Sequence, residues 1–266
     1  VCSSDLGGFG EISGLWVGKF ETTGEYTEGN ASRVSVRPGK SSLRNMMIKD
    51  QYKAGMKATY GETVDLQSHM AKNSEWGAIS YLGHSKYGTN RLEIKKNQNA
   101  SLCTGGTNLV EEIYTKNKTQ ATTYNATGVY DLNGGTWERT AAYIDNREKM
   151  LSVYAGNAQG DLYGATIDEQ STSTKYKNVY NSVNNKFEDY EMAGRKMKGD
   201  AIYETSWIKS NATGSWFETY SDFPYGGLPF LYRSGYYNRS GSGSFSYEMS
   251  DGSTNGLATF RLILVV

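Results

Sequence analysis

The sequence is poor in the residues that most often build metal centres and disulfide frameworks. Among its 266 residues are two cysteines, at positions 2 and 103, and two histidines, at positions 69 and 84. Two cysteines cannot form a disulfide framework in a chain of this length, and two histidines leave little for a histidine-based metal site or catalytic triad. The sequence therefore predicts no cofactor and no metal site, and it does not indicate a structural calcium ion.

Net charge and long apolar runs are also absent. The chain has 28 basic and 28 acidic residues, so no global charge favours nucleic acid or an acidic membrane as a partner. The longest apolar run, residues 262–266, suits a buried strand and is too short to span a membrane. We expect no nucleic-acid partner, and membrane anchoring only through a segment upstream of this sequence.

The first six residues, VCSSDL, are interpreted as foreign to the protein. They match the translation of a common short-read sequencing adapter, so residues 1–6 are excluded from reasoning about the fold. The natural N-terminus, with any signal peptide or anchor, is expected to lie upstream. The remainder shows no linker and no internal repeat, so residues 7–266 are predicted to form a single domain.

Tyrosine and glycine are abundant. The chain contains 21 Tyr and 31 Gly but only 3 Pro, a composition typical of domains in which short strands alternate with glycine-rich turns and irregular loops. Residues 12–20 and 258–266 have strand-like patterns of matching length. We expect them to pair as antiparallel strands, which would place Trp16 close to Ile263 and Leu264.

Two helices are predicted from the spacing of apolar residues. The first lies within residues 41–61 and the second within residues 71–88. The polar stretch 168–191 is compatible with a further helix of modest amphipathicity. The expected capping residues are Ser41 or Ser42 for the first helix and Asn73 or Ser74 for the second, and the apolar face of the second comprises Trp76, Ile79, Tyr81, Leu82 and Tyr87.

Several motifs occur in an order that resembles one protein family. They are GLWVGKFETT (14–23), Glu-Trp at 75–76, GVYDLNGGTWE (128–138), and Arg-Ser-Gly-Tyr at 233–236 followed by Phe-Arg at 260–261. Over nearly the whole chain they resemble the formylglycine-generating-enzyme-like (sulfatase-modifying factor) branch of the C-type-lectin-like fold, with departures at Gly135, Thr136 and Arg139. The resemblance implies an α+β domain with two helices, short antiparallel strands and much irregular loop. The residues expected to be structural are Trp16, Glu75, Trp76, Asp131, Gly134, Trp137, Glu138, Arg233, Phe260 and Arg261.

The GVYDLNGGTWE motif is interpreted as a structural clasp rather than a catalytic site. Residues 133–135, Asn-Gly-Gly, can adopt positive φ angles and form a tight reversal. This reversal would carry Trp137 into the interior, where a tryptophan buries about 200 Å². We expect Trp137 to anchor the core, and Glu138 and Arg261 to form a buried ion pair.

The catalytic residues that the resemblance implies are missing. Enzymes of the family use two nearby cysteines in the C-terminal part, which bind copper as thiolates, but residues 230–245 contain no cysteine. Cys103 is far upstream, and His69 and His84 cannot supply the three ligands that the iron-dependent relatives need. We therefore predict that the protein is not an enzyme and has no catalytic residue. A divergent enzyme of the formylglycine-generating type is the first alternative.

The C-terminal segment 216–256 has the composition of a binding surface. Tyrosine gives contact area at low entropy cost, and Ser and Gly adapt to a ligand; the alternative is that these tyrosines pack half-buried in a sheet. The candidate binding residues are Trp216, Tyr220, Tyr225, Tyr232, Tyr236, Tyr237, Arg239 and Tyr247. We expect Tyr225, Tyr236, Tyr237 and Arg239 to share one exposed face.

These patterns predict a non-enzymatic ligand-binding or adhesion domain. The resemblance implies the position of the binding segment, because bacterial and phage proteins that use this fold for variable binding diversify the segment before the terminal strand. The domain would be displayed on a bacterial surface, a pilus-like appendage or a phage tail, and would bind an external protein or carbohydrate. A structural pilus or coat subunit is the second alternative.

Overall fold

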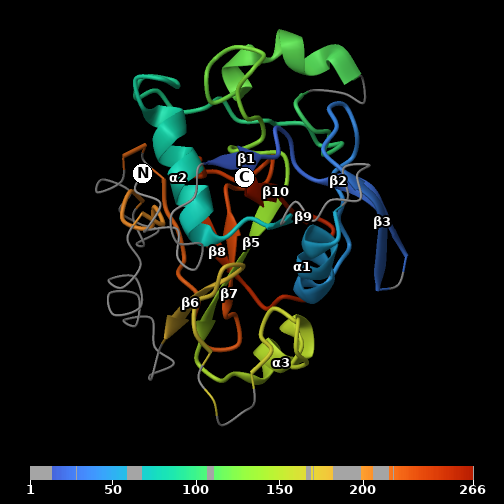
Figure 1. Ribbon diagram of the computed structural model, residues 1–266. Helices are drawn as coiled ribbons and strands as arrows, with labels where there is room; N and C mark the ends of the chain where they lie inside the picture. The colour runs from blue at the N-terminus through green and yellow to red at the C-terminus, as the bar shows by residue number, and fades with distance from the viewer. Residues whose placement is uncertain are drawn as a thin grey trace.

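The computed structural model describes residues 14–27, 29–58, 68–106, 111–165, 169, 171–181, 199–205, 216–217 and 219–265. In these residues, three α-helices accompany ten short strands in three sheets, which confirms the predicted α+β class and adds one helix to the two expected (Figure 1). The helices are α1 (Ile48–Met56), α2 (Asn73–His84) and α3 (Lys149–Ala155). The interpretation of residues 1–6 lies outside the described residues.

The first and last described strands pair as predicted, although residues 258–260 of the predicted C-terminal strand pair with residues 137–139 instead. β1 (Leu15–Val17) and β10 (Leu262–Val265) run antiparallel, with Trp16 opposite Leu264, and β4 (His69–Met70) pairs with the other edge of β10. Figure 1 shows β1 and β10 side by side. Trp16, however, is 67% exposed. It is not the structural anchor that was expected, because its neighbours in this edge strand face the core instead.

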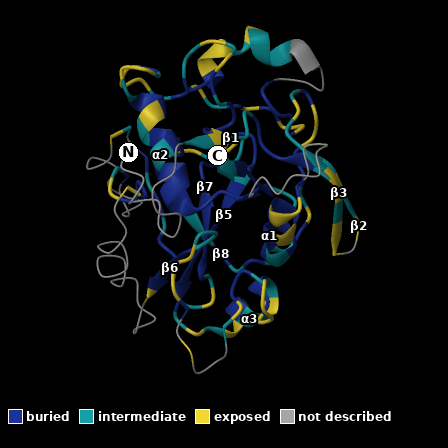
Figure 2. Ribbon diagram, in the orientation of Figure 1, coloured by how far each residue is buried: buried dark blue, intermediate teal, exposed yellow. Residues whose placement is uncertain are grey.

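A second sheet, centred on β5, forms the middle of the molecule. β5 (Trp137–Asp145) continues directly from the GVYDLNGGTWE motif, and all of its residues except the first are buried. It pairs in parallel with β6 (Asn178–Asn181) and β9 (Ala258–Phe260) and antiparallel with β7 (Phe230–Arg233). β7 pairs in turn with β8 (Tyr247–Ser250). Figure 2 shows that this sheet is buried almost throughout.

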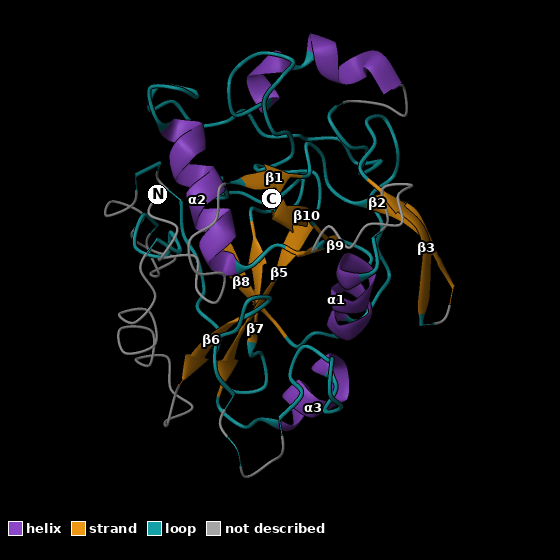
Figure 3. Ribbon diagram, in the orientation of Figure 1, coloured by secondary structure: helices purple, strands orange, loops and turns teal. Residues whose placement is uncertain are grey.

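A separate hairpin projects from the edge of the molecule beside α1. It consists of β2 (Thr23–Thr27) and β3 (Asn30–Ser35), which pair with each other in a two-stranded sheet. Figure 3 shows the hairpin and α1 on the same side of the molecule, away from α2. Tyr26 links the two elements, because its hydroxyl donates to Asp50 Oδ2 of α1 at 2.7 Å.

The first predicted helix exists, but it starts later than expected. α1 begins at Ile48, after Met47. The expected caps, Ser41 and Ser42, form isolated bridges with Cys103 and with Thr23 instead, so the backbone is extended there. The predicted boundary is wrong because long-range backbone pairing holds this segment.

The second predicted helix also differs at its ends. α2 begins at Asn73, and the backbone nitrogen of the preceding Lys72 donates to Glu75 Oε2 at 2.8 Å. The expected caps, Asn73 and Ser74, therefore lie inside the first turn, while Glu75 has the structural role expected of it. The apolar face is narrower than predicted: Trp76 and Ile79 are buried, Tyr81 is partly buried, and Leu82 and Tyr87 are exposed.

The polar stretch before β7 was the hardest to predict. The suggested helix at 168–191 is wrong at residues 178–181, which form β6, and much of the remaining stretch lies outside the described residues. Sequence reasoning missed α3, which has only seven residues and is too short to show a helical repeat of apolar residues. No helix among the described residues is long and apolar enough to cross a membrane.

Several large charged side chains are fully buried in the core. The largest fully buried side chain is Trp76, and the next three by volume are Arg139, Arg233 and Arg261. Burying a guanidinium is unfavourable unless its nitrogens find acceptors. Each of these arginines donates at least one hydrogen bond to a backbone carbonyl from a distant part of the chain.

Candidate functional site

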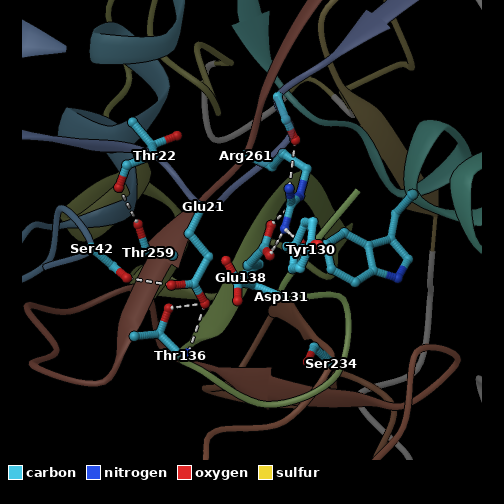
Figure 4. A network of polar contacts seen from close by, with 12 residues as sticks. Glu21, Thr22, Ser42, Tyr130, Asp131, Thr136, Glu138, Ser234, Thr259 and Arg261 are labelled. Carbon is cyan, nitrogen blue, oxygen red and sulfur yellow. Dashed lines mark hydrogen bonds and ion pairs between the residues drawn. The ribbon is translucent and has the colours of Figure 1, made fainter. Parts of the chain in front are cut away.

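A buried ion pair ties the GVYDLNGGTWE motif to Arg261, the residue between β9 and β10 (Figure 4). Arg261 Nε donates to Glu138 Oε2 at 2.9 Å, and Arg261 Nη2 contacts Glu138 Oε1 and donates to the Tyr130 carbonyl at 2.8 Å. Both side chains of the pair are completely buried. The predicted pair is confirmed. Burial raises the pKa of Glu138 to about 7, although the charge of Arg261 acts in the opposite direction.

A second carboxylate, Glu21, lies in the same network and was missed by sequence reasoning. Its Oε1 accepts hydrogen bonds from the Thr136 backbone nitrogen (2.7 Å) and hydroxyl (2.8 Å), and its Oε2 contacts the Ser42 hydroxyl (Figure 4). Burial, followed by the charges of Asp131 and Glu138, raises the pKa of Glu21 well above its ordinary value. Its place in the GLWVGKFETT motif was the one signal that pointed to it.

Asp131 completes the network. Its carboxylate accepts hydrogen bonds from Asn97 Nδ2 at 2.9 Å and from the Gly105 backbone nitrogen at 2.9 Å, and burial raises its pKa. Asp131 also has a φ of +65°, whereas Asn133, the expected member of the turn, does not have a positive φ. The network thus joins four distant segments in a fully buried position, so its chemistry is structural.

The glycine turn of the motif supports a surface loop. Gly134 and Gly135 have φ angles of +85° and +71°, as predicted, and a Cβ at Gly134 would lie 2.3 Å from the Asn97 carbonyl oxygen. Gly134 N donates to Ser234 Oγ at 3.1 Å, and the Gly135 carbonyl accepts from Tyr237 N at 3.0 Å. These two bonds fix the loop that follows β7.

Trp137 is not the core anchor that the motif predicted. Its side chain is only partly buried, whereas Trp76 is fully buried and donates from Nε1 to the Ser244 carbonyl at 2.9 Å. Trp137 stacks on Tyr232 with ring centroids 5.0 Å apart, and the edge of Tyr236 meets it at 4.6 Å. Because Trp137 is the first residue of β5, it lies at the rim of the sheet and packs against the loop.

Four candidate binding residues form one partly exposed cluster, which we call the tyrosine–arginine surface: Tyr220, Tyr236, Tyr237 and Arg239. The guanidinium of Arg239 lies 5.2 Å from the ring centroid of Tyr220, and the rings of Tyr236 and Tyr237 meet edge to face at 5.7 Å. Arg239 also pairs with Glu248 of β8. The surface is therefore held by side-chain contacts as well as by the glycine turn.

Two other candidates are core residues. Tyr232 is 5% exposed and its ring lies against the guanidinium of Arg139, and Tyr247 is 1% exposed on the neighbouring strand β8. For these two, the alternative that tyrosines pack in the sheet is correct, because both point from β7 and β8 into the interior. They cannot contact an external ligand in this structure.

The last two candidates lie apart from the tyrosine–arginine surface. Tyr225 forms a bridge with Leu228 just before β7, whereas Tyr236 follows the other end of that strand. The expected single face therefore does not include Tyr225. Trp216 is 59% exposed and contacts Tyr81 and Phe245, with ring centroids 6.2 Å and 5.3 Å away.

A serine, a histidine and a glutamate meet near Phe245, but they do not form a catalytic triad. Ser244 Oγ lies 3.2 Å from His84 Nε2 and 3.0 Å from Glu93 Oε1, and the same Nε2 lies 3.3 Å from that carboxylate. In a triad the carboxylate binds the other ring nitrogen, which here faces the Ser80 carbonyl at 2.8 Å. Ser244 is also fully buried. This group joins α2 to the loop before β8.

The remaining candidates for chemistry are buried. Cys103 is buried, and desolvation raises the pKa of its thiol to about 11, which disfavours the reactive thiolate. His69 is fully buried against Glu75, with 2.9 Å between Nε2 and Oε1. Within the described part of the chain, no group of three His, Cys, Asp or Glu side chains is placed to hold a metal ion.

Comparison with known proteins does not assign a family. No protein-family model matches the chain, and no curated protein matches it either. The resemblance carried by the motifs therefore stays a prediction, and the function has to be argued from the geometry of the tyrosine–arginine surface.

Proposed function

We propose that the protein is a non-enzymatic ligand-binding domain that contacts an external protein or carbohydrate through the tyrosine–arginine surface. The observation that carries the proposal is the hydrogen bond from Tyr237 N to the Gly135 carbonyl at 3.0 Å. It fixes partly exposed aromatic side chains on a rigid support before any ligand arrives. A surface that is already ordered loses less conformational entropy on binding.

The residue types of this surface suit recognition. Tyrosine and arginine are enriched among the residues that dominate binding energy, because each combines a large contact area with hydrogen-bonding groups. Asn238 and Ser240 are exposed within the same loop and add small polar groups. Arg239 is already paired with Glu248, so its main contribution is to hold the loop and Tyr220 in place.

The resemblance to the formylglycine-generating-enzyme-like branch of the C-type-lectin-like fold supports this location. Proteins that use the fold for variable binding diversify the segment before the terminal strand, and that segment contacts the ligand. Display on a bacterial surface, a pilus-like appendage or a phage tail would place many copies side by side. Linked sites raise the effective concentration of each next contact, so a weak single site gives firm attachment.

Binding of the full chain to a glycan microarray and to immobilised mucin, collagen and fibronectin tests the proposal. The double variant Tyr236→Ala/Tyr237→Ala should weaken binding by about tenfold or more, because it removes the two aromatic side chains at the centre of the surface. Tyr225→Ala is the matched control: it removes an exposed tyrosine away from the surface and should bind like the unmodified chain.

The melting temperature separates binding from folding in this experiment. Both tyrosines of the double variant are only partly buried, so their removal should change stability little. Unaltered binding by the double variant would contradict the proposal. A large fall in its melting temperature would contradict it as well, because these tyrosines would then serve the core.

A further inference from the structure

A rigid turn presents two cations beside the β2–β3 hairpin. Arg37 and Lys40 flank Pro38 and Gly39, and Gly39 has a φ of +64°, as a tight turn requires. Thr104 fixes this turn: its Oγ1 donates to the Arg37 carbonyl at 2.7 Å, its backbone nitrogen donates to the Lys40 carbonyl at 2.9 Å, and its own carbonyl accepts from Gly39 N at 2.9 Å. Thr104 is completely buried. The backbone beneath the two cations is therefore ordered in advance.

The two cations line an open groove of about 810 Å³ that also includes residues of both hairpin strands. A third cation in the lining, Arg33, pairs with Glu25 at 2.9 Å, and both of these side chains are largely exposed. Among the described residues of its lining are three cations and one carboxylate, an excess of positive charge, although the chain as a whole has no net charge. The excess is thus a local feature of one surface.

We propose that this groove binds an anionic polysaccharide, whose carboxylate or sulfate groups pair with Arg37, Lys40 and Arg33. Charge complementarity selects an anion, and the spread of the cations over a turn and a strand selects a chain with several charges over a single small ion. Ser35 and Ser41, which are partly or fully exposed, add hydroxyl groups to the lining, which match the hydroxyl groups of a sugar chain.

An acidic peptide fits the groove less well. A peptide that binds a sheet by strand addition needs an open strand edge. The open edges of this two-stranded hairpin lie on the outer sides of β2 and β3, whereas the groove is lined by residues of both paired strands and of the following turn, so a peptide added at an edge would lie beside the groove and not within it. A polysaccharide needs only the charges and hydroxyl groups of the side chains, so it is the occupant that the geometry favours.

The exposure of the cations determines how binding should behave. Arg33, Arg37 and Lys40 are all exposed, so each ion pair is weak and is screened by salt. Measurable affinity therefore requires several charged units on one chain and should fall steeply as ionic strength rises. This site does not share any residue with the tyrosine–arginine surface, so the two proposals can fail separately.

Biolayer interferometry with the full chain tests the inference, with polygalacturonate and heparin as carboxylated and sulfated probes and dextran as the neutral one. The unmodified chain should bind one or both charged probes and not dextran, and binding should weaken between about 50 and 500 mM NaCl. The variant Arg37→Glu/Lys40→Glu should reduce this binding by about tenfold or more. The control Lys86→Glu/Lys149→Glu changes the net charge equally at exposed positions elsewhere and should bind within about twofold of the unmodified chain.

Several outcomes would overturn the inference. An equal loss of binding in Arg37→Glu/Lys40→Glu and in the control Lys86→Glu/Lys149→Glu would show a general effect of net charge. Unaltered binding by Arg37→Glu/Lys40→Glu would place the anion elsewhere. Tighter binding of poly-glutamate than of either charged polysaccharide would favour an acidic protein partner. Retained binding of the charged probes by Tyr236→Ala/Tyr237→Ala is expected, and its loss would assign these probes to the tyrosine–arginine surface instead.

Discussion

At the scale of single residues, two tryptophans exchange the roles that the motifs suggested. Trp76 lies in the first turn of α2, is fully buried and uses its indole N–H in a hydrogen bond to the Ser244 carbonyl. Trp137 begins β5 and packs on Tyr232 at the rim of the sheet. Local sequence identifies both as large apolar residues next to a glutamate, but their depth depends on what the rest of the chain places over them.

This exchange predicts a clear order of stabilities. Trp76→Ala should lower the free energy of unfolding by about 3–5 kcal/mol, because it empties a closed part of the core. Trp137→Ala should cost clearly less, since one side of the residue is a loop that can adjust. Trp216→Ala, at a residue 59% exposed, should stay within about 0.5 kcal/mol. Urea unfolding followed by far-UV circular dichroism measures all three, and an equal cost for Trp76 and Trp137 would restore the clasp interpretation.

At the scale of elements, the existence of helices and strands was predicted better from the sequence than their boundaries were. The pairing of the first and last strands was predicted correctly, because both are short apolar runs with strand-like patterns. The start of α1 was not, because Ser41 and Ser42 are recruited by Cys103 and Thr23. No local pattern shows such a partner. The same reason applies to β6, whose parallel pairing with β5 outweighs the polar, helix-compatible sequence around it.

The glycine turn is the element whose failure should be easiest to observe. Gly134→Ala introduces a Cβ 2.3 Å from the Asn97 carbonyl oxygen at a φ of +85°, so it should destabilise the fold by about 1–3 kcal/mol. It should also speed hydrogen exchange at the Tyr237 amide, because the turn holds that amide. Gly227→Ala is the control, since a Cβ there meets nothing within 4 Å. Normal exchange at Tyr237 in Gly134→Ala would show that the loop does not depend on the turn.

At the scale of the whole molecule, the core contains a network of ionisable side chains that come from distant parts of the chain. Glu21, Asp131, Glu138 and Arg261 meet in one fully buried network, although they span almost the entire sequence. The pair of Glu138 with Arg261 could be predicted because both belong to motifs with an expected order. Glu21 was not predicted although it belongs to the GLWVGKFETT motif, because a glutamate between a phenylalanine and two threonines has the pattern of an ordinary exposed strand residue.

The network gives the stability of the protein an unusual dependence on pH. Burial is the first cause of raised pKa values at three network members, Glu21, Asp131 and Glu138 (to about 7), and also at Asp200 (to about 6), which lies outside the network and accepts a hydrogen bond from the Tyr180 hydroxyl at 2.7 Å. A carboxyl with a raised pKa binds its proton more tightly in the folded state, so its stabilising contribution is complete below the unfolded pKa and is lost as pH rises through the folded pKa. The free energy of unfolding should therefore increase as pH falls from about 8 to about 5. Lys177, whose pKa burial lowers to about 8, acts in the opposite direction only above this range.

Glu21→Gln should remove part of this dependence without loosening the network. When Glu21 is protonated, its Oε2–H can donate to Ser42 Oγ. The Ser42 hydroxyl can then donate its own hydrogen to the Leu102 carbonyl oxygen, which lies 3.2 Å from Oγ. A glutamine amide can make the same donation, and its oxygen can accept from Thr136. Urea unfolding at pH 5, 6.5 and 8 should thus show a flatter profile for Glu21→Gln, with stability at pH 8 equal to or above that of the unmodified chain. Glu25→Gln, at an exposed glutamate, should keep the original profile. If the unmodified chain is instead most stable at pH 8, the buried carboxylates are ionised in the folded state, and the network is held by charge rather than by shared protons.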